Sequence, residues 1–318
     1  MAADALHRLA GLGPVGRMAL VIVALLVLAT AVVLLLKRAR PQADLTELWF
    51  RVRSWWVMAA VFFAAVTVSR TVSILFFALM SFWALKEYVT LLKTRPADHR
   101  ALVLTFLAVP VQYYWVFDQW YGMFVLFIPV YMFLALPLEL VLARETSGFL
   151  GSAAQIHWGL MAFVFGLSHL AFLVTLPAVG EGLADGRTML LFLVFSVELS
   201  DVLQYVWGKT LGRHKIIPAV SPNKTWEGFL GGVGCTVAAS LLIRFLTPFS
   251  IPACLGLALL VTVAGFFGGA VMSAIKRDFG VKDFGALIPG HGGMLDRVDA
   301  LCYAAPLFFH VVRFFYYQ

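Results

Sequence analysis

Charged residues are scarce in this chain of 318 amino acids. Asp, Glu, Lys and Arg together make up 13% of the sequence, whereas an ordinary soluble domain contains about 25%. The apolar fraction is correspondingly high, at 62%. This balance excludes a typical water-soluble globular protein, and it also excludes a disordered chain, collagen and a coiled coil. A low charge with many phenylalanines indicates a protein whose solvent is largely lipid.

Cysteine is also rare. The chain has three, Cys235, Cys254 and Cys302, which lie far apart in apolar stretches. They form no C-x-x-C pair and have no histidine partner at a zinc-site spacing. The pattern favours buried structural thiols over a disulfide framework or a zinc site.

Acidic residues are outnumbered by basic ones, 17 to 24, which gives a formal net charge of +7. In a soluble protein such an excess would raise the question of nucleic acid binding. In membrane proteins Lys and Arg collect in cytoplasmic loops, and that bias alone accounts for a basic total. We therefore expect no nucleic acid partner.

Long apolar runs dominate the sequence. The first is an uncharged stretch over 18–36 that ends at Lys37 and Arg38. It is too long for the apolar part of a cleaved signal peptide and predicts a retained transmembrane helix. Further spans are expected at 55–69, 71–88, 101–117, 121–142, 156–176, 188–207, 228–246, 252–272 and 300–317. The sequence thus predicts an all-α, polytopic integral membrane protein with ten transmembrane helices, or nine if the two spans that meet near Arg70 are drawn differently.

The distribution of positive charge predicts an orientation. When the 37–54 loop is placed in the cytoplasm, alternation along the chain puts most of the 24 basic residues on that side. The loops 208–227 and 273–299 then face the cytoplasm of a cell (inner) membrane. We expect residues 1–187 to be transmembrane helices for scaffold and lipid access, and residues 188–318 to be the catalytic region, with its active site facing the cytoplasm.

A polar stripe interrupts one of the spans. Glu198, Asp201, Gln204, Tyr205 and Gly208 recur at helical spacing within 188–208 and share one face. A carboxylate at membrane depth costs several kcal/mol, roughly 2.5–3.5 on insertion scales, and is functional by default. The alternative is a structural polar contact between helices, or a depth shallow enough to remain hydrated.

A second polar segment follows that span. Ser221 and Pro222 have the pattern of an N-cap and a first helical residue, so they predict a helix start. The free backbone N–H groups of such a start attract anions, and Lys224 adds a positive charge suited to phosphate. Taken by itself, this segment is better explained as a capped helix with a lysine that follows the positive-inside rule.

The third segment is the most highly charged. The loop from Ser273 to Asp299 contains Lys276, Arg277, Lys282, Asp283, His291, Asp296, Arg297 and Asp299. Gly290, Gly292 and Gly293 flank the histidine and permit turns closed to other residues. Asp296 and Asp299 stand three residues apart at the start of the last span, a spacing that predicts two carboxylates on one face. Such oxygen ligands suit Mg²⁺ bound together with substrate phosphates. The alternative is a charged loop with internal salt bridges.

These segments resemble a known family. The sequence Ser-Ala-Ile-Lys-Arg over 273–277, followed by Lys282-Asp283 and by His-Gly-Gly-Met-Leu-Asp-Arg-Val-Asp over 291–299, is similar to the motif of the phosphatidate cytidylyltransferases, or CDP-diacylglycerol synthases. The segment 221–232 resembles the second hallmark of that family. Asp201, Tyr205 and Gly208 resemble a third element, in which Gln204 replaces the usual alanine.

The resemblance implies an integral-membrane nucleotidyltransferase that joins CTP to phosphatidic acid, with Mg²⁺ as cofactor. By this analogy the catalytic residues are Asp296, Asp299, Lys224 and Asp201, with both Asp296 and Asp299 as metal ligands. Phosphates would be held by Lys224, Lys276, Arg277, Lys282 and Arg297. The other residues expected to contact substrate are Tyr205, Ser221, Asn223, Thr225, Asp283, His291, Gly292 and Gly293. Whether a second metal or a monovalent cation joins Mg²⁺ stays open, and a homodimer is the expected assembly.

The sequence departs from the family pattern at one place. The family usually reads Gly-Asp-Leu-x-Glu-Ser before its Lys-Arg pair, whereas this chain has Gly269 and Met272 at the two acidic positions. Since the family's aspartate at the first position is a metal ligand, either Asp201 or Glu198 supplies the missing carboxylate, or the metal site is reduced, or the activity is altered. A transferase for a different lipid phosphate and a non-catalytic transporter or scaffold therefore remain alternatives.

Overall fold

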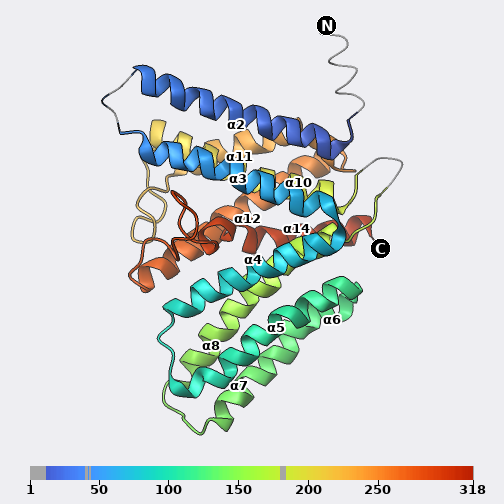
Figure 1. Ribbon diagram of the computed structural model, residues 1–318, viewed down its shortest axis with the longest axis vertical. Helices are drawn as coiled ribbons and strands as arrows, with labels where there is room; N and C mark the ends of the chain where they lie inside the picture. Colours follow the sequence, from blue (N-terminus) through green and yellow to red (C-terminus); the bar gives the residue numbers. More distant parts are fainter. Residues whose placement is uncertain (1–11, 40–41, 43, 180–183, 318) are drawn as a thin grey trace.

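A computed structural model describes residues 12–39, 42, 44–179 and 184–317. Within these ranges the regular structure is helical, and β-pairing is limited to two isolated bridges, Lys215 with Thr225 and Ile288 with Gly292. Figure 1 shows long helices packed side by side, and the connections between them include two longer loops, 211–225 and 279–294. The all-α fold expected from the hydropathy is confirmed.

The helices follow the predicted apolar runs closely. In chain order they are α2 (Pro14–Ala39), α3 (Thr46–Val68), α4 (Arg70–Leu91), η1 (Pro96–Asp98), α5 (His99–Asp118), α6 (Tyr121–Leu126), η2 (Phe127–Met132), α7 (Phe133–Leu142), α8 (Phe149–Gly159), η3 (Leu160–Gly166), α9 (Leu167–Val174), α10 (Gly186–Thr210), α11 (Trp226–Ser240), η4 (Arg244–Leu246), α12 (Ile251–Asp278), α13 (Leu295–Val298) and α14 (Leu301–Tyr316).

Nine helical segments of the described chain are long and apolar enough to cross a membrane. Four of them are composite: η1 with α5, α6 with η2 and α7, α8 with η3 and α9, and α13 with α14. The segment expected over 228–246 differs, because α11 has only 15 residues. At 1.5 Å per residue it is shorter than a hydrocarbon core of about 30 Å. The helix lengths therefore support nine spans within the described ranges, but the one that drops out is 228–246, whereas the two spans near Arg70 are the separate helices α3 and α4.

The helices surround a continuous apolar core. α4 runs through the middle of the molecule and packs against α3, α5, α9 and α13. On one side of it lie α2, α3 and the C-terminal helices α10, α11, α12 and α14, and on the other lie α5 to α8 (Figure 1). The peripheral α2 leaves large apolar side chains such as Leu28 and Leu35 exposed, as expected for helices that face lipid.

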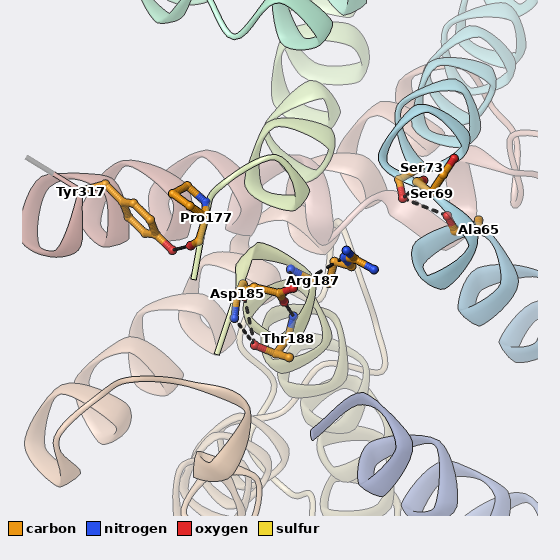
Figure 2. A network of polar contacts seen from close by, with 8 residues as sticks. All are labelled: Ala65, Ser69, Ser73, Pro177, Asp185, Arg187, Thr188 and Tyr317. Carbon is orange, nitrogen blue, oxygen red and sulfur yellow. Dashed lines mark hydrogen bonds and ion pairs between the residues drawn. The ribbon is translucent and has the colours of Figure 1, made fainter. Parts of the chain in front are cut away.

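The end of the molecule where α10 begins is closed by local hydrogen bonds (Figure 2). Asp185 caps α10 by accepting hydrogen bonds from the backbone N–H groups of Arg187 and Thr188, both at 3.0 Å. The Tyr317 hydroxyl donates to the carbonyl of Pro177 over 2.7 Å. Asp185 thus satisfies free backbone groups at the start of α10, and the polar stripe over 198–208 lies toward the other end of this helix.

The thiols were predicted with partial success. Cys254 and Cys302 are buried, and all three cysteines are free, as expected. The prediction was wrong for Cys235, which is exposed on α11. An exposed thiol is acceptable there because a free cysteine behaves as a small apolar side chain and tolerates contact with lipid.

Candidate functional site

The connection between α10 and α11 folds back on itself and forms part of the wall of a polar pocket. Ile216 N–H donates to the Lys224 carbonyl over 3.1 Å, and Trp226 N–H donates to the His214 carbonyl over 2.9 Å. Glu227 closes the loop further by accepting the backbone N–H groups of Arg213 and His214. These contacts fix the backbone of Lys224, whose side chain lines the pocket.

The helix start expected at Ser221 lies elsewhere. α11 begins at Trp226, and its N-cap is Thr225, whose hydroxyl accepts the Gly228 N–H over 3.1 Å. Ser221 instead belongs to a turn, because its carbonyl accepts the Lys224 N–H. The prediction that Ser221 is the N-cap is wrong. The backbone pairing of Lys224 with Ile216 keeps residues 221–224 outside the helix.

Small residues let α10 and α11 approach closely at this point. A Cβ atom at Gly232 would lie 2.6 Å from the backbone nitrogen of Gln204, and one at Gly228 would lie 2.8 Å from the Gln204 carbonyl oxygen. Gly228 and Gly232 are four residues apart, and this small-xxx-small spacing lets the two helices pack closely. The close approach aligns the polar stripe of α10 with the loop that carries Lys224.

The pocket has a volume of about 250 Å³ and lies between α10, α11, α12 and the start of the last helix. It is lined by Asp201, Gln204, Tyr205, Asn223, Lys224, Thr225, Gly228, Phe229, Phe266, Gly269, Ser273 and Asp299. A second pocket, of about 400 Å³, lies between Leu241 and Phe249 and has no carboxylate in its wall. The first pocket is therefore the candidate for acid- or metal-assisted chemistry.

Lys224 is the cation of the pocket. Its Nζ lies 4.3 Å from the centroid of the Phe266 ring, a cation–π contact that positions the ammonium. Burial lowers the pKa of Lys224, while the nearby carboxylates Asp201 and Asp299 act in the opposite direction. A partly desolvated lysine beside two acids is suited to hold an anionic substrate group.

Two carboxylates share the pocket with this lysine. Asp201 comes from α10 and Asp299 from the junction between α13 and α14. The Asp299 carboxylate also accepts the Ala300 N–H over 2.7 Å. Within the described ranges, no three His, Cys, Asp or Glu side chains gather closely enough to hold a metal ion alone. Two carboxylates nevertheless fit Mg²⁺, which is usually bound by one or two carboxylates together with substrate phosphates.

Asp296, expected beside Asp299, faces a different environment. Its carboxylate accepts a 3.0 Å hydrogen bond from Lys276 and 2.9 Å hydrogen bonds from the backbone N–H groups of Phe284 and Gly293. The Asp296 side chain is 2% exposed, and the residue does not line the pocket. Three donors already satisfy this carboxylate, so the structure gives it the contacts of a structural anchor for the loop.

The other expected residues are divided between the pocket and its surroundings. Tyr205, Asn223 and Thr225 line it. Glu198 lies one helical turn from Asp201 and is half-buried, close enough for the charges of Asp201, Arg297 and Asp299 to act on it. The pocket wall does not include Glu198, Ser221, Lys276, Arg277, Lys282, Asp283, His291, Gly292, Gly293, Asp296 or Arg297.

Two of these outlying residues have contacts that explain their position. Arg277 donates to the Val220 carbonyl over 3.3 Å and so joins the end of α12 to the loop before α11. His291 packs edge-on against Trp55, with ring centroids 6.0 Å apart. Burial and the charge of Arg297 lower the pKa of His291, so the imidazole is neutral near pH 7.

Phe229, Phe266 and Ser273 line the pocket but were missed in the sequence. The two phenylalanines pack together with centroids 4.5 Å apart, and Phe266 supports Lys224. In a chain with 28 phenylalanines no pattern marks these two. Ser273 opens the motif over 273–277 but was not assigned to the site; its hydroxyl donates to the Gly269 carbonyl within α12.

Residues 49–315 match the model of the cytidylyltransferase family. The chain belongs to this family. The match includes α4 to α14 and nearly all of α3, so the family extends well beyond the pocket to most of the helices. Membership makes the protein a nucleotidyltransferase, and its apolar helices make it a multi-pass membrane protein.

Individual relatives differ in how much of the chain they cover. A protein of Escherichia coli (strain K12) described as "Uncharacterized protein YnbB" is 43% identical over 92% of this chain and 96% of its own length. The phosphatidate cytidylyltransferase of Staphylococcus aureus (strain COL) is 40% identical over 40% of this chain and 50% of its own length. The phosphatidate cytidylyltransferase of Staphylococcus haemolyticus (strain JCSC1435) is 41% identical over 39% of this chain and 48% of its own length. The chain thus matches about half the length of these phosphatidate cytidylyltransferases.

Proposed function

We propose that this protein transfers the cytidylyl group of CTP to phosphatidic acid, releasing pyrophosphate and forming CDP-diacylglycerol for phospholipid biosynthesis. The observation that carries the proposal is the pocket in which Asp201 and Asp299 face Lys224. It occurs in a membrane-spanning member of the cytidylyltransferase family that shares 40% identity with a phosphatidate cytidylyltransferase over part of its length.

The reaction needs positioning and charge neutralisation more than covalent catalysis. A phosphate oxygen of the lipid attacks the α-phosphorus of CTP, and the bond from that phosphorus to the departing pyrophosphate breaks. The lipid phosphomonoester is already largely ionised near pH 7, so no strong general base is needed. This fits a site in which Lys224 can bind phosphate and His291 lies outside the pocket.

The pocket suits the phosphates of the nucleotide. Its volume of about 250 Å³ is below the usual range of about 300–1,000 Å³ for a whole ligand site, so it would hold the triphosphate and leave the base outside. Asp201 and Asp299 would hold Mg²⁺, which when bound neutralises charge on the phosphates. Lys224 would bind an adjacent phosphate oxygen, and Asn223 would supply an amide donor.

The orientation is part of the proposal. With the 208–227 and 273–299 loops in the cytoplasm, the pocket opens toward aqueous CTP and lies next to the inner membrane that supplies the lipid. The positive-inside rule supports this placement. The homodimer expected as the assembly also remains a prediction.

A different lipid phosphate is the second candidate acceptor. One observation favours it: glycine stands at 269, where the family pattern has an acid. Both candidates use the same pocket and the same nucleotide. They differ in the lipid that must lie beside Lys224.

The test uses purified protein in lipid vesicles with CTP and Mg²⁺, offering phosphatidic acid, lysophosphatidic acid or a polyprenyl phosphate. We expect CDP-diacylglycerol, identified by mass spectrometry, and one pyrophosphate for each CTP consumed. UTP and GTP serve as nucleotide controls, and Asp299→Asn serves as the inactive variant. Product with only another lipid phosphate would establish the second candidate. The absence of any CTP-dependent product would support the non-catalytic alternative.

A further inference from the structure

The start of the last helix is held by an acid from the other half of the chain. Glu87, near the C-terminal end of α4, accepts the backbone N–H groups of Met294 and Leu295 at 2.9 and 2.8 Å. These groups belong to the first turn of α13, where a helix leaves its N–H groups without internal partners. One carboxylate therefore satisfies two amides that lie more than 200 positions away in the sequence.

The loop is shaped to admit this carboxylate. A Cβ atom at Gly285 would lie 2.7 Å from a carboxylate oxygen of Glu87, and one at Gly293 would overlap the same group. A side chain at either place would displace the Glu87 carboxylate from its present position. Gly285 and Gly293 are thus explained by the close approach of the loop backbone to the Glu87 side chain.

No competing role for Glu87 is visible. Among the described residues, no Lys, Arg or His lies within ion-pair distance of its carboxylate. The side chain is half-buried, and its two oxygens each accept one backbone amide. Hydrogen bonds from amides to an ionised carboxylate are about twice as strong as neutral ones. The contacts made by Glu87 are therefore directed at the loop alone.

The anchored turn leads directly to the pocket. α13 continues through Asp299 and Ala300, which both have helical backbone angles, into α14. Asp299 therefore lies about one helical turn beyond the two amides that Glu87 binds. Any rotation or shift of that turn would move the Asp299 carboxylate relative to Asp201 and Lys224.

We infer that Glu87 is a positioning residue for the metal-binding carboxylate Asp299, an inference that rests on the proposed function. It makes α4 part of the catalytic apparatus, although α4 contributes no residue to the pocket wall. Residues that orient metal ligands typically change metal affinity or activity about 10- to 100-fold when they are replaced.

The test compares Glu87→Gln and Glu87→Ala with the wild-type protein in lipid vesicles. The control is Glu47→Gln, which removes an exposed acid of α3 that pairs only with Arg51 on the same helix. Hydrogen exchange of peptides from 284–297 reports the anchoring, and the Mg²⁺ concentration for half-maximal activity reports the position of Asp299. A mere loss of folded protein would lower the rate without moving this Mg²⁺ concentration.

We expect faster exchange in 284–297 but not in α10, and a Mg²⁺ requirement raised about tenfold or more in the alanine variant. The glutamine variant, which keeps one acceptor oxygen, should lie between alanine and wild type. Unchanged exchange in both variants, or an unchanged Mg²⁺ requirement despite faster exchange, would overturn the inference. If the wild-type protein formed no CTP-dependent product, the proposed function would fail, and the exchange data would still decide whether Glu87 anchors the loop.

Discussion

The ammonium of Lys276 donates a 3.0 Å hydrogen bond to the carboxylate of Asp296, and this ion pair lies beside the pocket and not within it. The two side chains are only 16% and 2% exposed. They connect the end of α12 to the start of α13, the two segments that carry Gly269 and Asp299. The pair therefore fixes the relative position of two walls of the pocket.

Breaking this pair should chiefly reduce stability. Asp296→Asn leaves the half-buried Lys276 without its counter-ion, and the loss should not exceed about 3–5 kcal/mol, the cost of breaking a fully buried pair. The double variant Lys276→Met with Asp296→Asn removes the unpaired charge and should recover part of this loss. Denaturant unfolding in detergent micelles measures both. If Asp296→Asn kept wild-type stability but lost its response to Mg²⁺, Asp296 would be a metal ligand after all.

The alkaline side of the pH profile should report Lys224. Burial lowers the pKa of this lysine, so in the free protein it loses its proton at a lower pH than an exposed lysine, which titrates near 10.4. We expect kcat/KM for CTP to fall as the pH rises through that lowered value, because the neutral amine no longer attracts phosphate.

Replacing this lysine isolates its contribution. Lys224→Met should lower kcat/KM for CTP about 10²- to 10³-fold, the usual effect of losing one electrostatic donor in an active site. It should also abolish the alkaline decline described above. Lys93→Met, at an exposed position outside the pocket, is the control. An alkaline decline that survives in Lys224→Met would show that another group titrates.

Gly269 offers a direct test of the missing acid. A Cβ atom at this position would lie 3.5 Å from the Lys224 Nζ and meets no other atom within 4 Å, so a side chain fits. Gly269→Asp adds a third carboxylate to the pocket and should lower the Mg²⁺ concentration for half-maximal activity about 3- to 10-fold. Gly269→Asn has the same size without the charge and should leave it unchanged. An equal effect of both variants would assign the change to packing.

The helices could be predicted from the sequence because their signal is local. A run of apolar residues such as 188–207 is visible without knowing its neighbours, and α10 extends only a few residues beyond it. Asp201 and Lys224 could be predicted as well, since an acid at membrane depth and a lysine in a family motif stand out individually. The pocket brings these two residues together as expected.

The contacts that were missed depend on residues distant in sequence. Asp296 and Asp299 are three residues apart, and the spacing predicts one shared face. Lys276 and two loop amides nevertheless hold Asp296 away from the pocket. Ser221 has the composition of an N-cap, but the pairing of Lys224 with Ile216 moves the helix start to Thr225. No local pattern shows which partner satisfies a carboxylate or closes a turn.

Close packing of α10 on α11 yields the last prediction. Gly232→Ala places a Cβ 2.6 Å from the backbone nitrogen of Gln204, and the rigid backbone cannot move aside cheaply. Overpacking of this kind costs about 1–3 kcal/mol. The two helices should separate near Gln204 and weaken CTP binding as well as stability. Gly234→Ala, on the same helix, meets no atom within 4 Å and is the matched control. Its thermal midpoint in detergent should equal that of the wild type or exceed it, because alanine favours the helix. Equal stability of the two variants would mean that α10 and α11 lie farther apart in the membrane than in this structure, with room for a Cβ atom at position 232.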